Sequence, residues 1–335
     1  MMSAPLLELS DLIVRYPLGT AGIFGRSRQP VVHAVEGLSL TVQAGEIVAL
    51  VGESGCGKST VARTIVGLQH ASGGRVIFDG VDIAGLRGAE LRPYRRAIQL
   101  VHQDPYDALD PRLTVRAIVE EGLRIHRVPR GDRAAIVSQA LERVGLAPAA
   151  TVLDRFPHQL SGGQRQRVAI AAAIALTPRL LVADEPVSML DVSVRASVLE
   201  LIDDLRRDGL AVLIITHDLT GAVMLADRIA VMYFGRIIEE GPARQVMDAP
   251  VHPYTRALVS AIPSPDPAVC MQPDGPADGP VDGAAGELPD PVHPPPGCAF
   301  ASRCPVVESA CGDAIPVLIE VAAGHRVACI RAARG

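Results

Sequence analysis

The sequence contains no tryptophan, and aromatic residues make up only 3% of its 335 residues. Because 48% of the residues are hydrophobic, the chain can still bury a sizeable core, which must be built from Ala, Val, Leu and Ile. Its longest apolar run, Val168 to Leu176, falls far short of the roughly 20 residues of a membrane span. The N-terminus lacks the charged-then-apolar order of a signal peptide, so we expect a cytoplasmic protein that meets a membrane only through a partner.

Basic residues do not outnumber acidic ones in this sequence. Lys and Arg number 32 against 37 Asp and Glu, which gives a net charge of −5. Proteins that bind nucleic acids normally carry a basic surface, so we expect no nucleic-acid partner.

Short apolar strands alternate with amphipathic helices over residues 6–262. This alternation predicts an α/β fold whose parallel sheet is covered on both faces. Between residues 104 and 160 the sequence becomes mostly helical and more charged, which predicts a helical subdomain inserted beside that sheet. The expected elements include strands at 47–51, 180–185 and 211–215 and helices at 60–68 and 194–207.

Composition changes after residue 262. Residues 263–297 are dense in Pro, Gly, Asp and Ala, which is typical of a linker between domains. Residues 298–335 would then form a small second module, rich in cysteine. About forty residues seldom hold a fold without a cross-link or metal, so we expect the cysteines there to stabilise it. The predicted organisation is a large first domain at 1–262, a linker at 263–297 and this module.

A glycine-rich segment joins the expected strand at 47–51 to the helix that follows it. The phosphate-binding pattern G-x-x-x-x-G-K-[ST] is matched by Gly52-Glu53-Ser54-Gly55-Cys56-Gly57-Lys58-Ser59. Such a loop points backbone N–H groups at phosphates, and the helix adds its positive end. Lys58 is expected to reach the β- and γ-phosphates of ATP and Ser59 to bind Mg²⁺, with a chance glycine-rich turn as the alternative. The nucleotide contacts expected here come from Gly52, Ser54, Gly55, Cys56, Gly57, Lys58, Ser59 and Thr60.

Two carboxylates end another apolar strand, Leu180 to Ala183. We expect Asp184 to hold Mg²⁺, and Glu185 to orient and deprotonate an attacking water. The alternative is an ordinary strand end with solvated acids. His217 follows the strand at 211–215, where a histidine on its own more often caps or packs.

Between these motifs stands the segment Leu160-Ser161-Gly162-Gly163-Gln164. A small hydroxyl and bare N–H groups at a helix start make an anion site. In isolation the segment would be no more than a good helix cap with a flexible lead-in. Its position between the two nucleotide motifs favours a binding role for Ser161, Gly162, Gly163 and Gln164.

Together these motifs resemble those of ATP-binding cassette (ABC) ATPases, in which the LSGGQ segment completes the ATP site of a partner subunit. The resemblance implies that His217 contacts the γ-phosphate and that Gln103 links Mg²⁺ to a transmembrane partner. It also implies that Tyr16 stacks on adenine, although a half-buried strand tyrosine is the alternative, and that Asp191 lies in the loop joining two dimer halves.

Two further segments, Phe156-Pro157-His158-Gln159 and the run from His252 to Leu258, resemble the oligopeptide/dipeptide permease type. Asp104-Pro105-Tyr106 and the run from Leu160 to Arg167 resemble the second of the two ATPases that such systems usually carry. The resemblance implies an ATPase subunit at the cytoplasmic face of the membrane. Its partners would be a second ATPase subunit, two transmembrane permease subunits and, indirectly, an extracytoplasmic solute-binding protein. The transported solute would be chosen by those other subunits. The rival functions are a soluble ABC-type ATPase of DNA repair or translation and an ATP-dependent metal- or redox-sensing module.

The tail carries four cysteines spaced Cys298-x5-Cys304-x6-Cys311-x17-Cys329. Thiolates of this kind bind zinc or an iron–sulfur cluster. Zinc sites usually pair their cysteines two to four residues apart, and no such pair exists here. The family resemblance implies a [4Fe–4S] cluster, with zinc and unligated or disulfide-bonded thiols as the alternatives.

Overall fold

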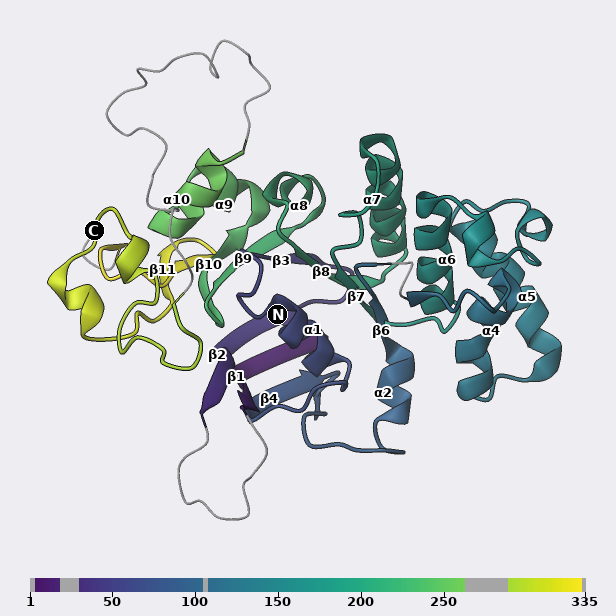
Figure 1. Ribbon diagram of the computed structural model, residues 1–335, viewed down its shortest axis with the longest axis horizontal. Coiled ribbons are helices and arrows are strands. Elements are labelled where there is room, and N and C mark those ends of the chain that lie inside the picture. Colours follow the sequence, from purple (N-terminus) through teal and green to yellow (C-terminus); the bar gives the residue numbers. More distant parts are fainter. Residues whose placement is uncertain (1–3, 19–29, 105–107, 263–288, 333–335) are drawn as a thin grey trace, which may run out of the picture.

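The computed structural model describes residues 4–18, 30–104, 108–262 and 289–332. Two β-sheets and the helices around them make up these ranges (Figure 1). None of the helices in these ranges has both the length and the apolar character needed to cross a bilayer.

The larger sheet has eight strands in the order β11-β12-β10-β9-β3-β8-β7-β6. Five of them form its parallel part: β6 (Ile98–Val101), β7 (Leu180–Asp184), β8 (Ala211–Thr216), β3 (Ile47–Val51) and β9 (Arg228–Tyr233). Strand β3 is apolar at every position and fully buried, which suits the centre of a sheet that is covered on both faces. Ile47, Ala49 and Val51 pack into one hydrophobic cluster and Val48 and Leu50 into the other, so the core lies on both sides of the sheet.

The sheet is mixed, whereas the sequence predicted a parallel one. Beyond β9 it continues antiparallel through β10 (Arg236–Pro242), β12 (His325–Val327) and β11 (Ile319–Ala322). A second, antiparallel sheet has the order β2-β1-β4-β5. Its strands are β1 (Leu7–Pro17), β2 (Val31–Val42), β4 (Gly73–Phe78) and β5 (Val81–Asp82). Short turns join β9 to β10, β11 to β12 and β4 to β5, and turns of this kind connect antiparallel strands.

Helices cover the sheets and form one separate group. The helices nearest the sheets are α1 (Lys58–Ile65), α2 (Arg92–Ala97), α7 (Val192–Arg207), α8 (Leu219–Leu225), α9 (Ala243–Asp248) and α10 (Pro253–Ser260). The group at one end of the molecule consists of α4 (Val115–Ile125), α5 (Arg130–Arg143) and α6 (Gly162–Ile174) (Figure 1). This group lies where the sequence predicted an inserted helical subdomain, with α6 added to it.

The C-terminal region, residues 289–332, is built into the larger sheet (Figure 1). Strand β12 pairs with β10, and β11 pairs with β12. Because its strands complete this sheet, the described part of the tail gives no support to the separate Cys-rich module predicted from the sequence. The boundaries predicted at 262 and 297 stay predictions, and most of the expected linker, 263–288, lies outside the described residues.

A buried polar cluster joins β10 to this C-terminal region. Glu239 is fully buried, and its carboxylate accepts hydrogen bonds from the backbone amides of Val251 and His252 at 2.7 and 2.8 Å. The same carboxylate lies 2.8 Å from Nε2 of His325, which is 2% exposed. A buried carboxylate is tolerated only with such partners, so Glu239 fixes the docking of β12.

We expect Glu239→Ala to lower the free energy of unfolding by about 3–5 kcal/mol, because it leaves two amides and an imidazole buried without their partner. The exposed pair Arg116–Asp154 provides the control, since Asp154→Ala should cost less than about 1 kcal/mol. Urea denaturation measures both effects, and limited proteolysis reports whether the C-terminal region is released. Equal losses in the two variants would contradict the docking role of Glu239.

Candidate functional site

A cavity of about 510 Å³ lies beside the loop that follows β3. Its walls come from β2, from the glycine-rich loop and from the segments that follow β6, β7, β8 and β9. The lining residues are Val32, His33, Ala34, Ser54, Gly55, Cys56, Gly57, Lys58, Ser59, Thr60, Gln103, Glu185, His217, Phe234, Gly235 and Pro291. Most of the expected phosphate-loop residues therefore share one cavity with Gln103, Glu185 and His217.

The glycines of the loop are required by its contacts with neighbouring strands. A Cβ on Gly52 would lie 2.2 Å from the carbonyl oxygen of Met232, and a Cβ on Gly57 would lie 2.2 Å from that of Ala34. Gly57 also has a φ of 108°, in the left-handed region. Any larger residue at either position would push the loop off the sheet.

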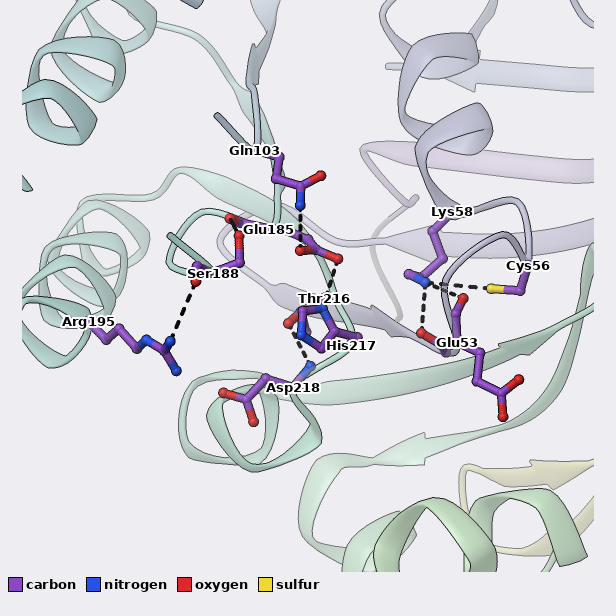
Figure 2. A network of polar contacts seen from close by, with 11 residues as sticks. Glu53, Cys56, Lys58, Gln103, Glu185, Ser188, Arg195, Thr216, His217 and Asp218 are labelled. Carbon is purple, nitrogen blue, oxygen red and sulfur yellow. Dashed lines mark hydrogen bonds and ion pairs between the residues drawn. The ribbon is translucent and has the colours of Figure 1, made fainter. Parts of the chain in front are cut away.

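Lys58 begins α1 and lies under the loop. Its ammonium group donates hydrogen bonds to the carbonyl oxygens of Gly52 and Glu53, both at 2.7 Å, and it is only 6% exposed (Figure 2). Both of these acceptors are neutral carbonyls, so neither hydrogen bond brings a counter-ion to the ammonium group. The loop therefore holds one cation against the floor of the cavity.

A cation site is suggested by Asp184, the last residue of β7. Oδ1 of Asp184 is buried with no hydrogen-bond partner. Burial raises the pKa of Asp184, because it penalises the charged form, while the nearby Ser59 hydroxyl acts to lower the pKa of this carboxyl. A hydroxyl and an orphaned carboxylate oxygen side by side are the ligands that Mg²⁺ prefers, so these residues fit that ion.

Glu185 is held from two sides at the edge of the cavity. The side-chain amide of Gln103 donates to Oε2 at 3.0 Å, and Nδ1 of His217 lies 2.8 Å from Oε1 (Figure 2). Glu185 has a φ of 47°, rare for a non-glycine residue, and its amide donates to the carbonyl oxygen of Ile215. Three strand ends thus bring together side chains from residues 103, 185 and 217.

The segment Ser161–Gln164 stands apart from this cavity and begins α6. The Ser161 hydroxyl accepts from the Gln164 amide at 3.3 Å, and the Gln164 side chain accepts from the Ser161 amide at 3.0 Å. This reciprocal cap leaves the helix start ordered. At Gly163 a Cβ would lie 2.4 Å from Cγ1 of Val194, so α6 packs closely on α7.

Comparison with known proteins decides the family. Residues 35–188 match the family described as ABC transporter, and residues 238–311 match the C-terminal region of oligopeptide/dipeptide transporters. A probable peptide ABC transporter ATP-binding protein of Sinorhizobium fredii is 46% identical over 98% of this chain and 90% of its own length. The chain belongs to the ABC transporter ATP-binding proteins.

Other members agree in sequence and in fold. The oligopeptide transport ATP-binding protein OppF of Salmonella typhimurium is 41% identical over 97% of this chain and 96% of its own. A dimeric ATP-binding cassette solved with ADP and Pi is 30% identical, with a TM-score of 0.61, and covers 71% of this chain and 99% of its own. A subunit of an ABC transporter complex of Clostridium perfringens is 29% identical, with a TM-score of 0.63. The match covers 74% of this chain and 92% of that subunit. This ABC subunit therefore has the P-loop ATPase fold of the cassettes.

Besides Asp184 and the segment at 161–164, three more predicted nucleotide-site residues lie outside the lining of the cavity. Tyr16, on β1, is half-buried, and its hydroxyl lies 3.5 Å from Oγ1 of Thr60. Gly52 lies beneath the loop, where its missing side chain makes room for Met232. Asp191 is the exposed residue before α7, and its side chain makes no capping hydrogen bond. Their roles in this ABC subunit stay predictions.

Sequence reasoning missed several residues that line the cavity of this ABC subunit. Val32, His33 and Ala34 come from β2, and Phe234 and Gly235 from the turn between β9 and β10. Pro291 comes from the region expected to be a linker, and its carbonyl oxygen accepts from the amide of His33 at 2.8 Å. No local pattern marks these positions, since they meet only through the folding of distant strands.

The cysteines of the tail are free thiols, and they line one small cavity together with His252. Hereafter this is called the thiol cavity, lined by Cys298, Cys304, Cys311 and Cys329. Across the described residues, however, no group of three or more His, Cys, Asp or Glu side chains is placed to hold a metal ion. The predicted iron–sulfur cluster and its zinc alternative therefore find no support in the arrangement of these side chains.

Proposed function

We propose that this ABC subunit hydrolyses ATP to power the import of peptides or related small solutes through a membrane transporter. The observation that carries the catalytic part is the Glu185 carboxylate, held by Gln103 and His217 at the edge of the phosphate-loop cavity. The transport part is supported by the relatives, which are named for peptide import or transport and match nearly the whole chain.

ATP would lie in the cavity with its phosphates against the loop. Backbone N–H groups from Ser54 to Thr60 and the ammonium of Lys58 would bind those phosphates. Tyr16 would stack on the adenine. Ser59, Asp184 and Gln103 would hold Mg²⁺, which when bound neutralises phosphate charge.

For hydrolysis, Glu185 would orient a water and accept its proton. The contact with Gln103 fixes one carboxylate oxygen, and His217 fixes the other. His217 lines the cavity and its side chain is 55% exposed, so its ring would be accessible to the γ-phosphate of ATP bound there. Gln103 stands at the end of β6, next to the helical group, and would pass motion from the site to permease subunits.

The segment from Leu160 to Gln164 would bind the ATP of a second subunit. Support comes from its position, since Ser161, Gly162, Gly163 and Gln164 do not line the cavity that the described residues form around Lys58. As at any helix start, the first backbone N–H groups of α6 have no acceptor within the helix, and such groups favour an anion. Two ATPase subunits would then sandwich two ATPs, with Asp191 near the join.

The partners of this arrangement would be that second ATPase subunit, two transmembrane permease subunits and, indirectly, an extracytoplasmic solute-binding protein. Such a complex would place the chain at the cytoplasmic face of the membrane. A soluble ATPase of DNA repair or translation, or a metal- or redox-sensing module, is favoured less, because the relatives named for peptide transport match the chain along almost its full length.

For the tail, a [4Fe–4S] cluster on Cys298, Cys304, Cys311 and Cys329 remains a proposal. Its support is limited to the chemistry of four free thiols that line the thiol cavity. The domain boundaries at 262 and 297 remain proposals as well.

Replacing Glu185 by Gln should keep ATP binding and lower the ATPase rate of the assembled transporter by about 10²–10⁴-fold, the usual contribution of a general base. The closed dimer should accumulate with ATP, and size-exclusion chromatography would detect it. Glu200→Gln, on the exposed face of α7, is the control and should hydrolyse ATP at the normal rate. A normal ATPase rate in Glu185→Gln would contradict the role of Glu185 as the general base.

Ser161→Arg should leave ATP binding to the isolated subunit intact and prevent the ATP-dependent dimer, because the arginine would occupy the partner's phosphate site. Lys58→Ala should instead weaken ATP binding to the isolated subunit. Titration with a fluorescent nucleotide measures ATP binding to each variant, and light scattering measures dimer formation with ATP. The cross-subunit arrangement is wrong if both variants lose binding equally.

Protein purified without oxygen should be brown and carry about four irons per chain if the tail holds a cluster. Cys304→Ser and Cys311→Ser should both lose the colour, while Cys56→Ser, in the phosphate loop, should keep it. Elemental analysis and visible absorbance provide the measurements. Colourless, iron-free wild-type protein would rule out the iron–sulfur cluster. One zinc per chain in that protein would instead support a zinc site on the same cysteines.

A further inference from the structure

An arginine of the C-terminal region reaches the phosphate loop. The Arg303 guanidinium donates to both carboxylate oxygens of Glu53, with Nη1 and Nη2 each at 3.0 Å, across 250 residues of sequence. This is the two-point geometry in which arginine binds carboxylates most specifically. Glu53 is the residue after Gly52 in the loop, and its side chain points away from Lys58 (Figure 2).

The pair is held in place by an aromatic cluster. The Arg303 guanidinium carbon lies 5.8 Å from the ring centres of both Tyr233 and Phe300, and its Nη1 also donates to the Tyr233 hydroxyl at 3.3 Å. The Tyr254 hydroxyl accepts from the backbone amide of Glu53 at 2.9 Å. Both the backbone and the side chain of Glu53 are therefore fixed.

Little water reaches the arginine, whose side chain is 5% exposed, against 29% for Glu53. In such surroundings the attraction is screened less than at the surface, and loss of one partner leaves a charge without compensation. The Glu53 carbonyl oxygen accepts one of the hydrogen bonds that hold Lys58. A chain of contacts thus runs from Arg303 through Glu53 to the lysine of the loop.

The same region meets the nucleotide cavity at a second place, where Pro291 lines it and accepts the hydrogen bond from His33. Next to Arg303 in sequence is Cys304, which lines the thiol cavity. Phe300, which the arginine contacts, lines that cavity too. One short segment therefore contacts both the phosphate loop and the thiol cavity.

We propose that Arg303 is a positioning residue of the nucleotide site, through which the C-terminal region sets the affinity of the phosphate loop for ATP. The proposal deepens the proposed ATPase function and rests on it. The C-terminal region is thereby a part of the ATP site in this chain.

The experiment compares Arg303→Met, which keeps the apolar stem, with Arg303→Lys, which keeps the charge but loses the second contact. A fluorescent ATP analogue is titrated into each full-length variant. We expect the Kd of Arg303→Met to rise about tenfold, in line with the loss of a charge-assisted pair, and that of Arg303→Lys to rise less. Arg331→Met is the matched control, because Arg331 contacts Val306 and Glu308 of the same region instead, and its Kd should stay within about twofold of wild type.

A double-mutant cycle with Glu53→Gln separates positioning from general damage. If Arg303 acts through Glu53, the double variant should bind ATP no more weakly than Arg303→Met alone. Additive losses, or an unchanged Kd in Arg303→Met, would overturn the proposal. Should Arg303→Met fail to fold, Glu53→Gln alone must show the tenfold rise. Since binding is measured on the isolated chain, a transporter that binds but does not hydrolyse ATP would count against the proposed function and leave this result standing.

Discussion

The parallel register of three strands is the constraint on which the site depends. Val51 of β3 lies opposite Thr216 of β8, and Asp184 of β7 lies opposite Ile215 of the same strand. Parallel strands end at the same edge of a sheet, and ligands of such sheets bind outside those carboxyl ends. The phosphate loop, Glu185 and His217 each follow one of these strands. The cavity exists because the three strands end in line.

Buried charges in this chain are placed where they join distant segments. Lys58 is held by loop carbonyls, Glu239 by two amides and His325, and Arg303 by Glu53 and Tyr233. Each has partners that offset the cost of removing it from water. Two of the three contacts bind the C-terminal region, one to strand β10 and one to the phosphate loop. The C-terminal region thus contributes two strands to the larger sheet and two buried charged or polar contacts to the rest of the chain, although its composition differs.

Local patterns predicted the elements closest to the chemistry with good accuracy. The strand at 47–51 is β3 as predicted, and the strands expected at 180–185 and 211–215 are β7 and β8, each within one residue. A continuous apolar run of five or six residues indicates a strand that is buried on both faces of a sheet. Such a strand can therefore be recognised from the sequence alone. Helix ends were less accurate: α1 begins at Lys58 rather than residue 60, because Gly57 turns left-handed just before it.

The sequence by itself determined where the phosphate-loop motif and the paired Asp184 and Glu185 stand, because each of these motifs is contiguous and its spacing is local. Only the tertiary structure decided which side chains meet. Gln103 and His217 contact one carboxylate because β6, β7 and β8 are neighbours in the sheet. Arg303 reaches Glu53 because the chain returns to the edge of that sheet about 250 residues later. Such contacts depend on strand order and packing, and no periodicity along the chain encodes them.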